Sequence, residues 1–262
     1  MKYSGMKIRC SSGKEPVLEV RKRGKVTARF LLHRGLHFIF YILYFIFYIS
    51  FSVHSVSAQP IAMRDVFAAM PDSIAPLVTK NNRLDCIDYI ENGMEARVRN
   101  ILDEYVTLEA LTSDYTRFRT SSSSVMEMKL LPVNDSTSVL CLVRTAQTGE
   151  LNTARHLEDS NIRFLHPDWS PLDSASSSRF SLPPLSTFVD ASASDTAPSD
   201  TLVQALRSLD SFHPVRLALS PDEATLTVTL QPAYLDRDER RAITPHLRPL
   251  RFRWNGTAFE LE

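Results

Sequence analysis

The chain has 262 residues with 30 basic and 30 acidic side chains, so its formal net charge is zero. The charges are unevenly spread, because residues 1–58 hold ten of the Lys and Arg residues and only two of the acids. Subtraction leaves 20 basic and 28 acidic residues for positions 59–262, and such an acidic surface repels phosphate backbones. We therefore expect no nucleic-acid partner.

The first predicted element is a basic leader that ends in an uncharged, aromatic-rich segment at 38–53. Val56-Ser57-Ala58 follows and provides the small residues that a signal peptidase needs. This order predicts a secretory signal peptide over 1–58 that is cleaved after Ala58. A retained membrane anchor is the alternative, but the apolar segment is short for a span of about 20 residues. We expect an exported protein of the periplasm or cell envelope, or a secreted one, with membrane contact only through an uncleaved signal segment.

Short helices are predicted at the start of the mature chain. Apolar residues recur over 66–78 at spacings of three and four, which is the helical period, but two prolines interrupt the pattern. Asn81 or Asn82 is expected to cap the next helix, and Gly93 is expected to end it.

From residue 94 the pattern changes to the alternation of a β-strand. Alternating segments predict strands at 96–101, 105–111, 115–120, 125–131, 138–145, 152–156 and 162–165. Many short strands after paired helices are typical of an α+β domain with an antiparallel sheet. We assign residues 59–172 to a first α+β unit of this kind.

A second, smaller α+β unit is predicted at 201–262, beyond a linker rich in Ser, Ala and Pro at 173–200. It begins with an amphipathic helix capped by Ser199 or Asp200. It closes with a hairpin at an Asn-Gly turn, which is a strong signal for two antiparallel strands.

Two parts of the chain resemble each other. The hairpin pattern at 125–143 returns at 215–230, and 162–169 resembles 250–254, with about 90 residues between the copies in both places. The sequence therefore predicts two related helix-plus-sheet units. The alternative is that any two amphipathic hairpins look alike.

The mature chain contains two cysteines, Cys86 and Cys141. An oxidising compartment would allow a disulfide between them. Each, however, lies among regularly spaced apolar residues, which is typical of a small buried side chain. We expect two free thiols.

No nucleophile elbow, zinc-binding helix or phosphate-binding glycine loop is present, so no cofactor is expected. The densest polar cluster is formed by Arg83, Asp85 and Asp88. The two acids share a helix face and could act together, although a solvated first turn explains them as well. Trp169 and Trp254 end the two related units and are candidates for a ligand or partner surface, or else core anchors.

Four short motifs resemble a family of secreted proteins of unknown function from Bacteroidales. They are Met-Pro-Asp-Ser at 70–73, Asn-Asn-Arg-Leu-Asp-x-Ile-Asp at 81–88, Leu-Thr-x-Asp-Tyr at 111–115 and Met-Lys-Leu-Leu at 128–131. The resemblance covers residues 65–172 well and the remainder loosely. It implies a location in the Gram-negative envelope and carries no known activity, so no catalytic residue is assigned from it.

This lineage makes a further pattern relevant. Asp, then Ser or Thr, then a small aliphatic residue or Thr resembles the O-glycosylation sequence of Bacteroidetes envelope proteins. The pattern occurs in or beside the predicted linker at Ser174, Thr196 and Thr201. A Ser-rich segment also produces such triplets by chance, so the glycan is a hypothesis for these three residues.

The sequence favours a non-enzymatic envelope protein that binds a protein, a peptide or a glycan through its sheet, including by strand addition. The alternative is a periplasmic hydrolase whose carboxylates meet only in the fold, with Asp85, Asp88, Asp114 and Asp168 as candidates. Acids gathered in a pocket with raised pKa values would indicate an enzyme. A flat exposed patch would indicate binding.

Overall fold

The structure is a computed structural model that describes residues 40–45, 61–148, 156–173, 179–190 and 199–262. The chain divides into two compact units, residues 1–58 and 59–262. In the first unit, residues 40–45 are helical. None of the helices in the described residues combines the length and the apolar character that a membrane span requires.

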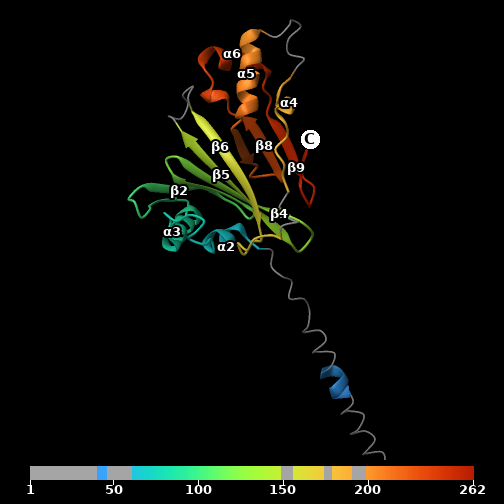
Figure 1. Cartoon of the computed structure of the whole chain (residues 1–262). Coiled ribbons are helices and arrows are strands. Elements are labelled where there is room, and N and C mark those ends of the chain that lie inside the picture. The colour runs from blue at the N-terminus through green and yellow to red at the C-terminus, as the bar shows by residue number, and fades with distance from the viewer. Residues whose placement is uncertain (1–39, 46–60, 149–155, 174–178, 191–198) are drawn as a thin grey trace, which may run out of the picture. The chain divides into compact units, whose positions relative to one another are not determined.

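The second unit contains two antiparallel sheets and short helices, which confirms the α+β class predicted from the sequence (Figure 1). The larger sheet has the order β1-β2-β3-β4-β5-β6, and its strands are β1 (Arg97–Arg99), β2 (Tyr105–Leu111), β3 (Tyr115–Ser121), β4 (Ser124–Pro132), β5 (Ser138–Thr148) and β6 (Leu157–Leu165). The smaller sheet has the order β10-β9-β8-β7, and its strands are β7 (Val215–Leu219), β8 (Thr225–Leu230), β9 (Leu250–Trp254) and β10 (Phe259–Leu261).

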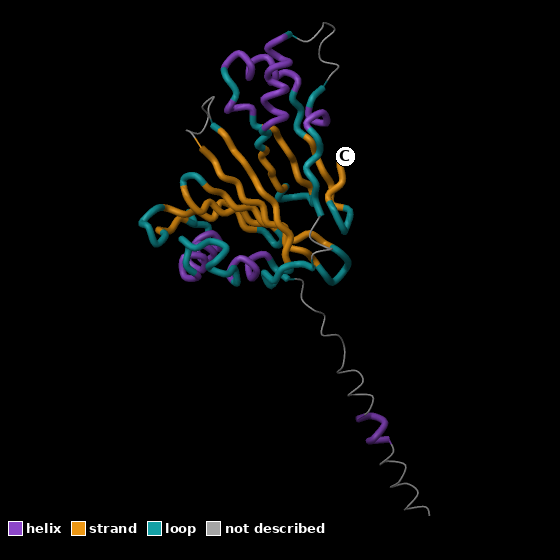
Figure 2. The backbone as a smooth tube through the Cα atoms, in the orientation of Figure 1, coloured by secondary structure: helices purple, strands orange, loops and turns teal. Residues whose placement is uncertain are grey.

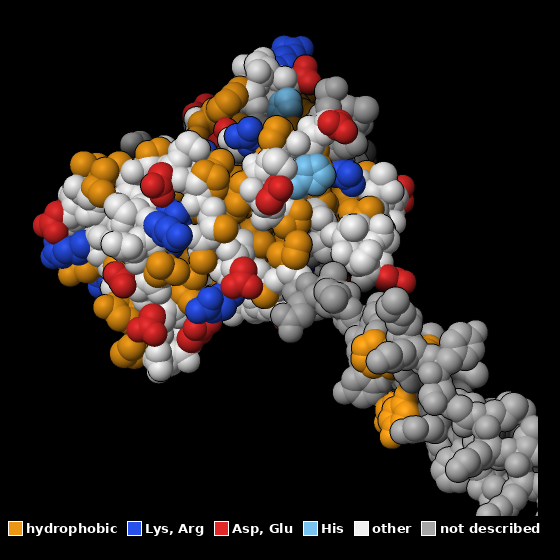
Figure 3. All heavy atoms as spheres, turned by 90° about the horizontal axis from the view of Figure 1, so that it is seen from below, with side chains coloured by type: hydrophobic (Ala, Val, Ile, Leu, Met, Phe, Trp, Pro, Cys, Tyr) orange, Lys and Arg blue, Asp and Glu red, His pale blue; other side chains and the backbone are white. Residues whose placement is uncertain are grey.

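Two helices, α2 (Met63–Ala68) and α3 (Lys80–Glu91), precede the larger sheet and cover one of its faces (Figure 2). Phe67 and Ile87 of these helices share a core with Phe118 and Met128 of the sheet. The remaining helical elements accompany the smaller sheet: α4 (Leu185–Phe188), α5 (Asp200–Ser211), η3 (Pro232–Tyr234), α6 (Arg237–Ile243) and η4 (Thr244–His246). The surface on the side of α2 and α3 mixes both signs of charge with apolar side chains (Figure 3).

The β4–β5 hairpin is buried on both sides. Leu140 and Leu142 of β5 belong to the core under α2 and α3, whereas Cys141 and Val143 belong to the core shared with the smaller sheet. Successive side chains of a strand point to opposite faces. A strand that is covered on both faces therefore appears in the sequence as a continuous apolar run.

The related stretches of sequence form equivalent strands. β4 pairs with β5 and β5 with β6, and in the same way β7 pairs with β8 and β8 with β9, all antiparallel. In the smaller sheet, η3, α6 and η4 lie between β8 and β9 in the chain. The relation between the two units stays a prediction.

The start of α3 differs from the prediction, because Thr79 and not Asn81 or Asn82 is its N-cap. The Thr79 hydroxyl accepts from the backbone N–H of Asn82 at 3.2 Å, and the Asn82 side-chain oxygen accepts from the backbone N–H of Thr79 at 3.0 Å. This reciprocal capping box satisfies two free N–H groups at once. α5 begins as expected, with Ser199 as its N-cap.

The predicted linker contains a packed segment at 179–190. Phe188 of α4 is fully buried, and the Phe180 ring meets the edge of Phe252 with 5.3 Å between ring centroids. These apolar side chains extend the core of the smaller sheet. Some of the predicted features fall outside the described residues, namely 1–39 and 46–58 of the signal peptide, 152–155 of one strand, and 174–178 and 191–198 of the linker.

Cys86 and Cys141 are unpaired and buried in different core clusters. Burial raises the pKa of Cys86 to about 12, and burial together with the charge of Glu127 raises the pKa of Cys141. Only the thiolate reacts, and burial disfavours this charged form, so both thiols are expected to react slowly in the folded protein. We expect iodoacetamide to modify both cysteines in denaturant and neither in the folded protein, as measured by peptide mass spectrometry. Modification of the folded protein at the denatured rate would contradict their burial.

Candidate functional site

Trp169 and Trp254 both lie in the core, each with 7% of its surface exposed. The Trp169 indole N–H donates to the Val66 carbonyl at 2.9 Å, and the Trp254 indole N–H donates to the Pro132 carbonyl at 2.6 Å. Trp169 thereby joins the turn after β6 to α2, and Trp254 joins β9 to the end of β4. Since the rings are used to connect distant elements, the structure does not place them on a ligand-facing surface.

The polar cluster of α3 is divided between the interior and the solvent. Arg83 is 2% exposed, and its guanidinium donates to the carbonyls of Met70 and Val78. Asp85 and Asp88 are exposed on the same helix. The three side chains therefore do not converge, because Arg83 holds the loop between α2 and α3 while the acids face water.

The other two candidate acids have separate surroundings. Asp114 pairs with Lys129 at 3.0 Å, and Asp168 accepts from the Ser170 hydroxyl at 2.5 Å. Hydrogen bonds from Ser170 lower the pKa of Asp168, whereas a general acid needs a raised pKa. Across the described residues, no group of three or more His, Cys, Asp or Glu side chains is placed to hold a metal ion. The four candidate acids of the hydrolase hypothesis therefore do not meet in one pocket.

Among the three residues of the glycosylation hypothesis, Thr201 lies within the described residues. It is exposed in the first turn of α5, where an enzyme can reach its hydroxyl. Ser174 and Thr196 lie outside the described residues. The glycan stays a prediction that the intact mass of the protein from its native host can test.

A candidate binding surface lies on the face of the larger sheet that is opposite α2 and α3. We call it the Arg–Tyr face, and it consists of five side chains of β1, β2 and β3: Arg97, Arg99, Tyr105, Thr107 and Arg119. In the strand register Arg97 pairs with Thr107, Thr107 with Arg119, and Arg99 with Tyr105. Directly paired residues of neighbouring strands point to the same face, so these side chains form two adjoining rows.

The smaller sheet covers this side of the larger sheet only in part. Its edge strand β7 contacts β4, β5 and β6, and Val143 and Phe164 lie in the core that the two sheets share. Tyr105, by contrast, is 44% exposed, and Arg97 and Arg99 are also exposed. An antiparallel sheet can be stable with one buried face, so its other face remains available for contact.

Tyr105 is the centre of the Arg–Tyr face. The guanidinium carbon of Arg97 lies 3.6 Å from the centroid of the tyrosine ring, and that of Arg99 lies 4.6 Å from it. Both distances are within the range of about 6 Å for a cation–π interaction. Hydrogen bonds to Asp103 and to the Tyr105 hydroxyl raise the pKa of Arg99. These contacts hold the three side chains together.

The surface is hollowed beside Tyr105. A depression of about 480 Å³ is lined by Glu95, Arg97, Glu104, Tyr105, Thr107, Arg119 and Ser122. Arg119 is neutralised by Glu109, whose carboxylate lies 2.7 Å away. The lining offers an aromatic ring, hydroxyls and both signs of charge, and these groups suit the donors and acceptors of a peptide or a sugar.

Side chains occupy backbone groups at one edge of each sheet, β1 and β7, which makes strand addition there a less favourable mode of binding. At the β1 edge the Arg99 carbonyl accepts from the Asn82 carboxamide at 2.9 Å. Alternate backbone N–H groups of β7 donate to side chains of the larger sheet, Val215 to Asp159, Leu217 to Ser160 and Leu219 to Glu127. These are the groups that an added strand would need. The exposed side chains of the sheet are thus better placed for binding than its edges.

Sequence reasoning missed the Arg–Tyr face because its residues look like those of any solvated strand. The alternation of Arg97 and Arg99, and of Tyr105 and Thr107, predicts that these side chains share a face. Nothing in that local pattern shows that the smaller sheet leaves the face uncovered. The signal in the sequence that could have indicated this face is Tyr105, which lies in a predicted strand next to the predicted strand that contains Arg97 and Arg99.

Comparisons with known proteins identify a family and a fold. A family model described as a protein of unknown function (DUF3256) matches residues 53–259. A search of curated proteins gives no match. Among solved structures, a domain of an uncharacterized protein from Porphyromonas gingivalis W83 matches with a TM-score of 0.60 and 24% identity, over 76% of this chain and 97% of that chain. At this identity the similarity shows the shared fold alone.

Proposed function

Since the chain belongs to the DUF3256 family of proteins of unknown function, we propose a role for it on the basis of its own surface. It is an exported, non-enzymatic binding protein of the cell envelope. The Arg–Tyr face binds a protein or peptide partner. A glycan is the other ligand that this face could accept. Export is supported by the basic leader, the apolar segment at 38–53 and the small residues that follow it.

The observation that carries the proposal is the exposed Tyr105 ring with the guanidinium groups of Arg97 and Arg99 over it. Tyrosine and arginine are enriched among the residues that contribute most to protein–protein affinity. Because the three side chains already contact one another, binding immobilises fewer free rotamers.

The charges of the face indicate the kind of partner. Arg119 and Arg99 have carboxylate neighbours in Glu109 and Asp103, at 2.7 Å in both cases, whereas Arg97 is held by its contact with the tyrosine ring. A partner that supplies a carboxylate to Arg97 would gain a charge-assisted hydrogen bond. We therefore expect a polypeptide segment with an acidic residue beside an apolar one.

The test is capture from envelope extract by the purified protein, with Tyr105→Ala as the variant. A bound polypeptide should be recovered by the unaltered protein, and its affinity for Tyr105→Ala should fall by about 2 kcal/mol, which is roughly thirtyfold. Surface plasmon resonance with the identified partner measures this difference. Treatment of the extract with a protease should remove the signal, whereas a glycan ligand would survive it.

Phe212→Ala is the matched control, because it removes an exposed aromatic ring that is remote in sequence from the Arg–Tyr face. This variant should bind the partner as the unaltered protein does. Equal binding by the Tyr105→Ala variant and by this control would contradict the assignment of the face.

A further inference from the structure

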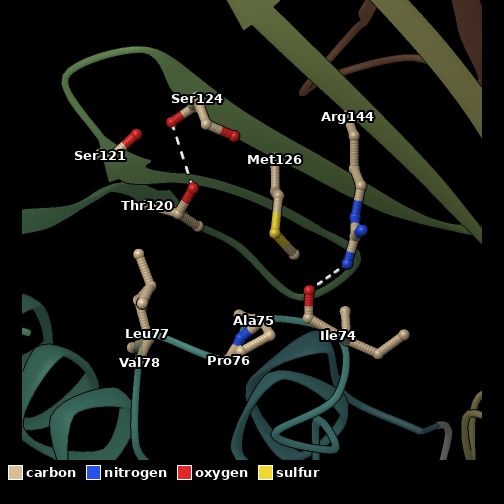
Figure 4. Close-up of a pocket in the computed structure, with 10 residues that line it drawn as sticks. All are labelled: Ile74, Ala75, Pro76, Leu77, Val78, Thr120, Ser121, Ser124, Met126 and Arg144. Carbon is tan, nitrogen blue, oxygen red and sulfur yellow. Dashed lines mark hydrogen bonds between the residues drawn. The ribbon is translucent and has the colours of Figure 1, made fainter. Parts of the chain in front are cut away.

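A second candidate site lies on the other face of the larger sheet, where the loop between α2 and α3 meets the β3–β4 hairpin (Figure 4). The pocket encloses about 230 Å³. The loop contributes apolar side chains from Ile74 to Val78, β4 contributes Met126, and β5 contributes Arg144. The pocket is independent of the Arg–Tyr face, which lies on the opposite side of the sheet.

The hairpin adds hydroxyl groups to the apolar walls. Thr120, Ser121 and Ser124 line the pocket, and the Thr120 hydroxyl donates to the Ser124 carbonyl at 3.3 Å (Figure 4). The lining is therefore mainly apolar, with a few polar groups and one guanidinium. This is the usual chemistry of a site for a small ligand with an apolar body and a polar end.

In the described part of the chain, the positive charge of Arg144 is not balanced by a carboxylate. Its guanidinium donates to the Ile74 carbonyl, while its Nε is buried and has no hydrogen-bond partner. Within the described residues no carboxylate forms an ion pair with it, and the charge that acts on it is the positive one of Arg163. Burial, and then the charge of Arg163, lower the pKa of Arg144. A partly buried cation without an acid is costly, and an anion in the pocket would remove part of that cost.

The loop wall of the pocket is fixed by hydrogen bonds to the rest of the protein, so the pocket is preformed. Arg83 donates to the Met70 carbonyl at 2.5 Å and to the Val78 carbonyl at 2.8 Å, one at each end of the loop. The Leu77 carbonyl also accepts from the backbone N–H of Ile101 at 3.2 Å. A ligand therefore need not order this wall, which favours affinity.

We propose that this pocket binds a small monocarboxylate with an apolar body, with its carboxylate on Arg144 and its body against the loop and Met126. The volume is below the roughly 300–1,000 Å³ of sites for drug-sized ligands, so the ligand is short. A medium-chain fatty acid has this chemistry, and so does the free carboxylate of a peptide that ends in an apolar residue.

The test is isothermal titration of the purified protein with octanoate, octanol and acetate. Octanoate should bind about tenfold or more tightly than octanol, because the alcohol can accept a hydrogen bond from Arg144 but carries no negative charge to pair with it. Acetate should bind more weakly than octanoate, because it lacks the apolar body. A short peptide ending in leucine is titrated in the same way, with the C-terminally amidated peptide as its control. Comparison of its affinity with that of octanoate shows whether the pocket prefers a peptide C-terminus or a fatty acid. Equal affinities for octanoate and octanol, or no binding of octanoate and peptide alike, would overturn the proposal.

Arg144→Gln is the variant that removes the charge from the pocket. It should bind octanoate about tenfold or more weakly and should no longer distinguish it from octanol. Arg163→Gln removes the same charge from the neighbouring strand β6, outside the pocket lining, and should retain the preference for octanoate. An equal loss in both variants would show a general charge effect and reject the site. If Arg144→Gln fails to fold, the comparison of octanoate with octanol on the unaltered protein decides the question.

Discussion

Replacement of Glu127 by alanine is expected to lower the free energy of unfolding by about 3–5 kcal/mol, because it breaks an ion pair within the larger sheet and removes a buried acceptor that also joins the smaller sheet. Glu127 is 4% exposed and pairs with Arg117. Its carboxylate also accepts from the Tyr115 hydroxyl at 3.1 Å and from the Leu219 backbone N–H at 3.3 Å. Alanine leaves these donors without an acceptor in the interior. Urea unfolding followed by circular dichroism measures the loss.

Glu109→Ala is the matched control for this prediction. Burial raises the pKa of Glu109, but hydrogen bonds from Arg117 and Arg119 outweigh this effect and lower it. The Glu109 side chain is 27% exposed, so its ion pairs lie near the surface. Ion pairs near the surface contribute about 0–1 kcal/mol, so this variant should be only slightly destabilised. If both variants lose the same stability, Glu127 does not have the structural role described.

Arg83→Met is expected to lower the free energy of unfolding by about 3 kcal/mol, because methionine fills the space of the arginine stem but donates no hydrogen bond. The carbonyls of Met70 and Val78 would then be buried without a partner. The same change should loosen the wall of the Arg144 pocket. Urea unfolding measures the stability, and hydrogen exchange of the amides at 74–78 measures the loop.

The matched control removes the acid that pairs with Arg83. Asp72 lies 3.0 Å from the guanidinium, but its side chain is 72% exposed. The pair is therefore screened by water, and Asp72→Ala should cost less than about 1 kcal/mol. A loss as large as that of Arg83→Met would mean that the ion pair, and not the two carbonyls, holds the loop.

Most of the strands could be predicted from the sequence because alternation is a local property. The segment predicted at 105–111 is β2, and the segments predicted at 115–120 and 125–131 differ from β3 and β4 by one residue at the ends. The helix caps were harder to predict, since Thr79, Asn81 and Asn82 all have suitable side chains. The backbone selects Thr79, because only there do the two hydrogen bonds of the capping box form together.

The roles of individual polar and aromatic side chains could not be predicted in the same way. Arg83 lies in a helix whose neighbouring residues are solvated, and its buried position follows from the loop that folds over it. Trp169 and Trp254 were equally suited to a surface or a core, and the partners of their indole N–H groups are more than 100 residues away in the chain.

The sequence by itself determined the α+β class, the antiparallel hairpins and the absence of recognised catalytic motifs, because each follows from spacing within a short segment. Only the tertiary structure decided which face of the larger sheet is left open around Tyr105, and that the partly buried Arg144 meets no acid among the described residues. Arg144 meets the carbonyl of Ile74 from 70 residues away, and Glu127 meets the N–H of Leu219 from 92 residues away. Burial and pairing of charges depend on such long-range packing, and a local pattern contains no information about which distant groups will meet.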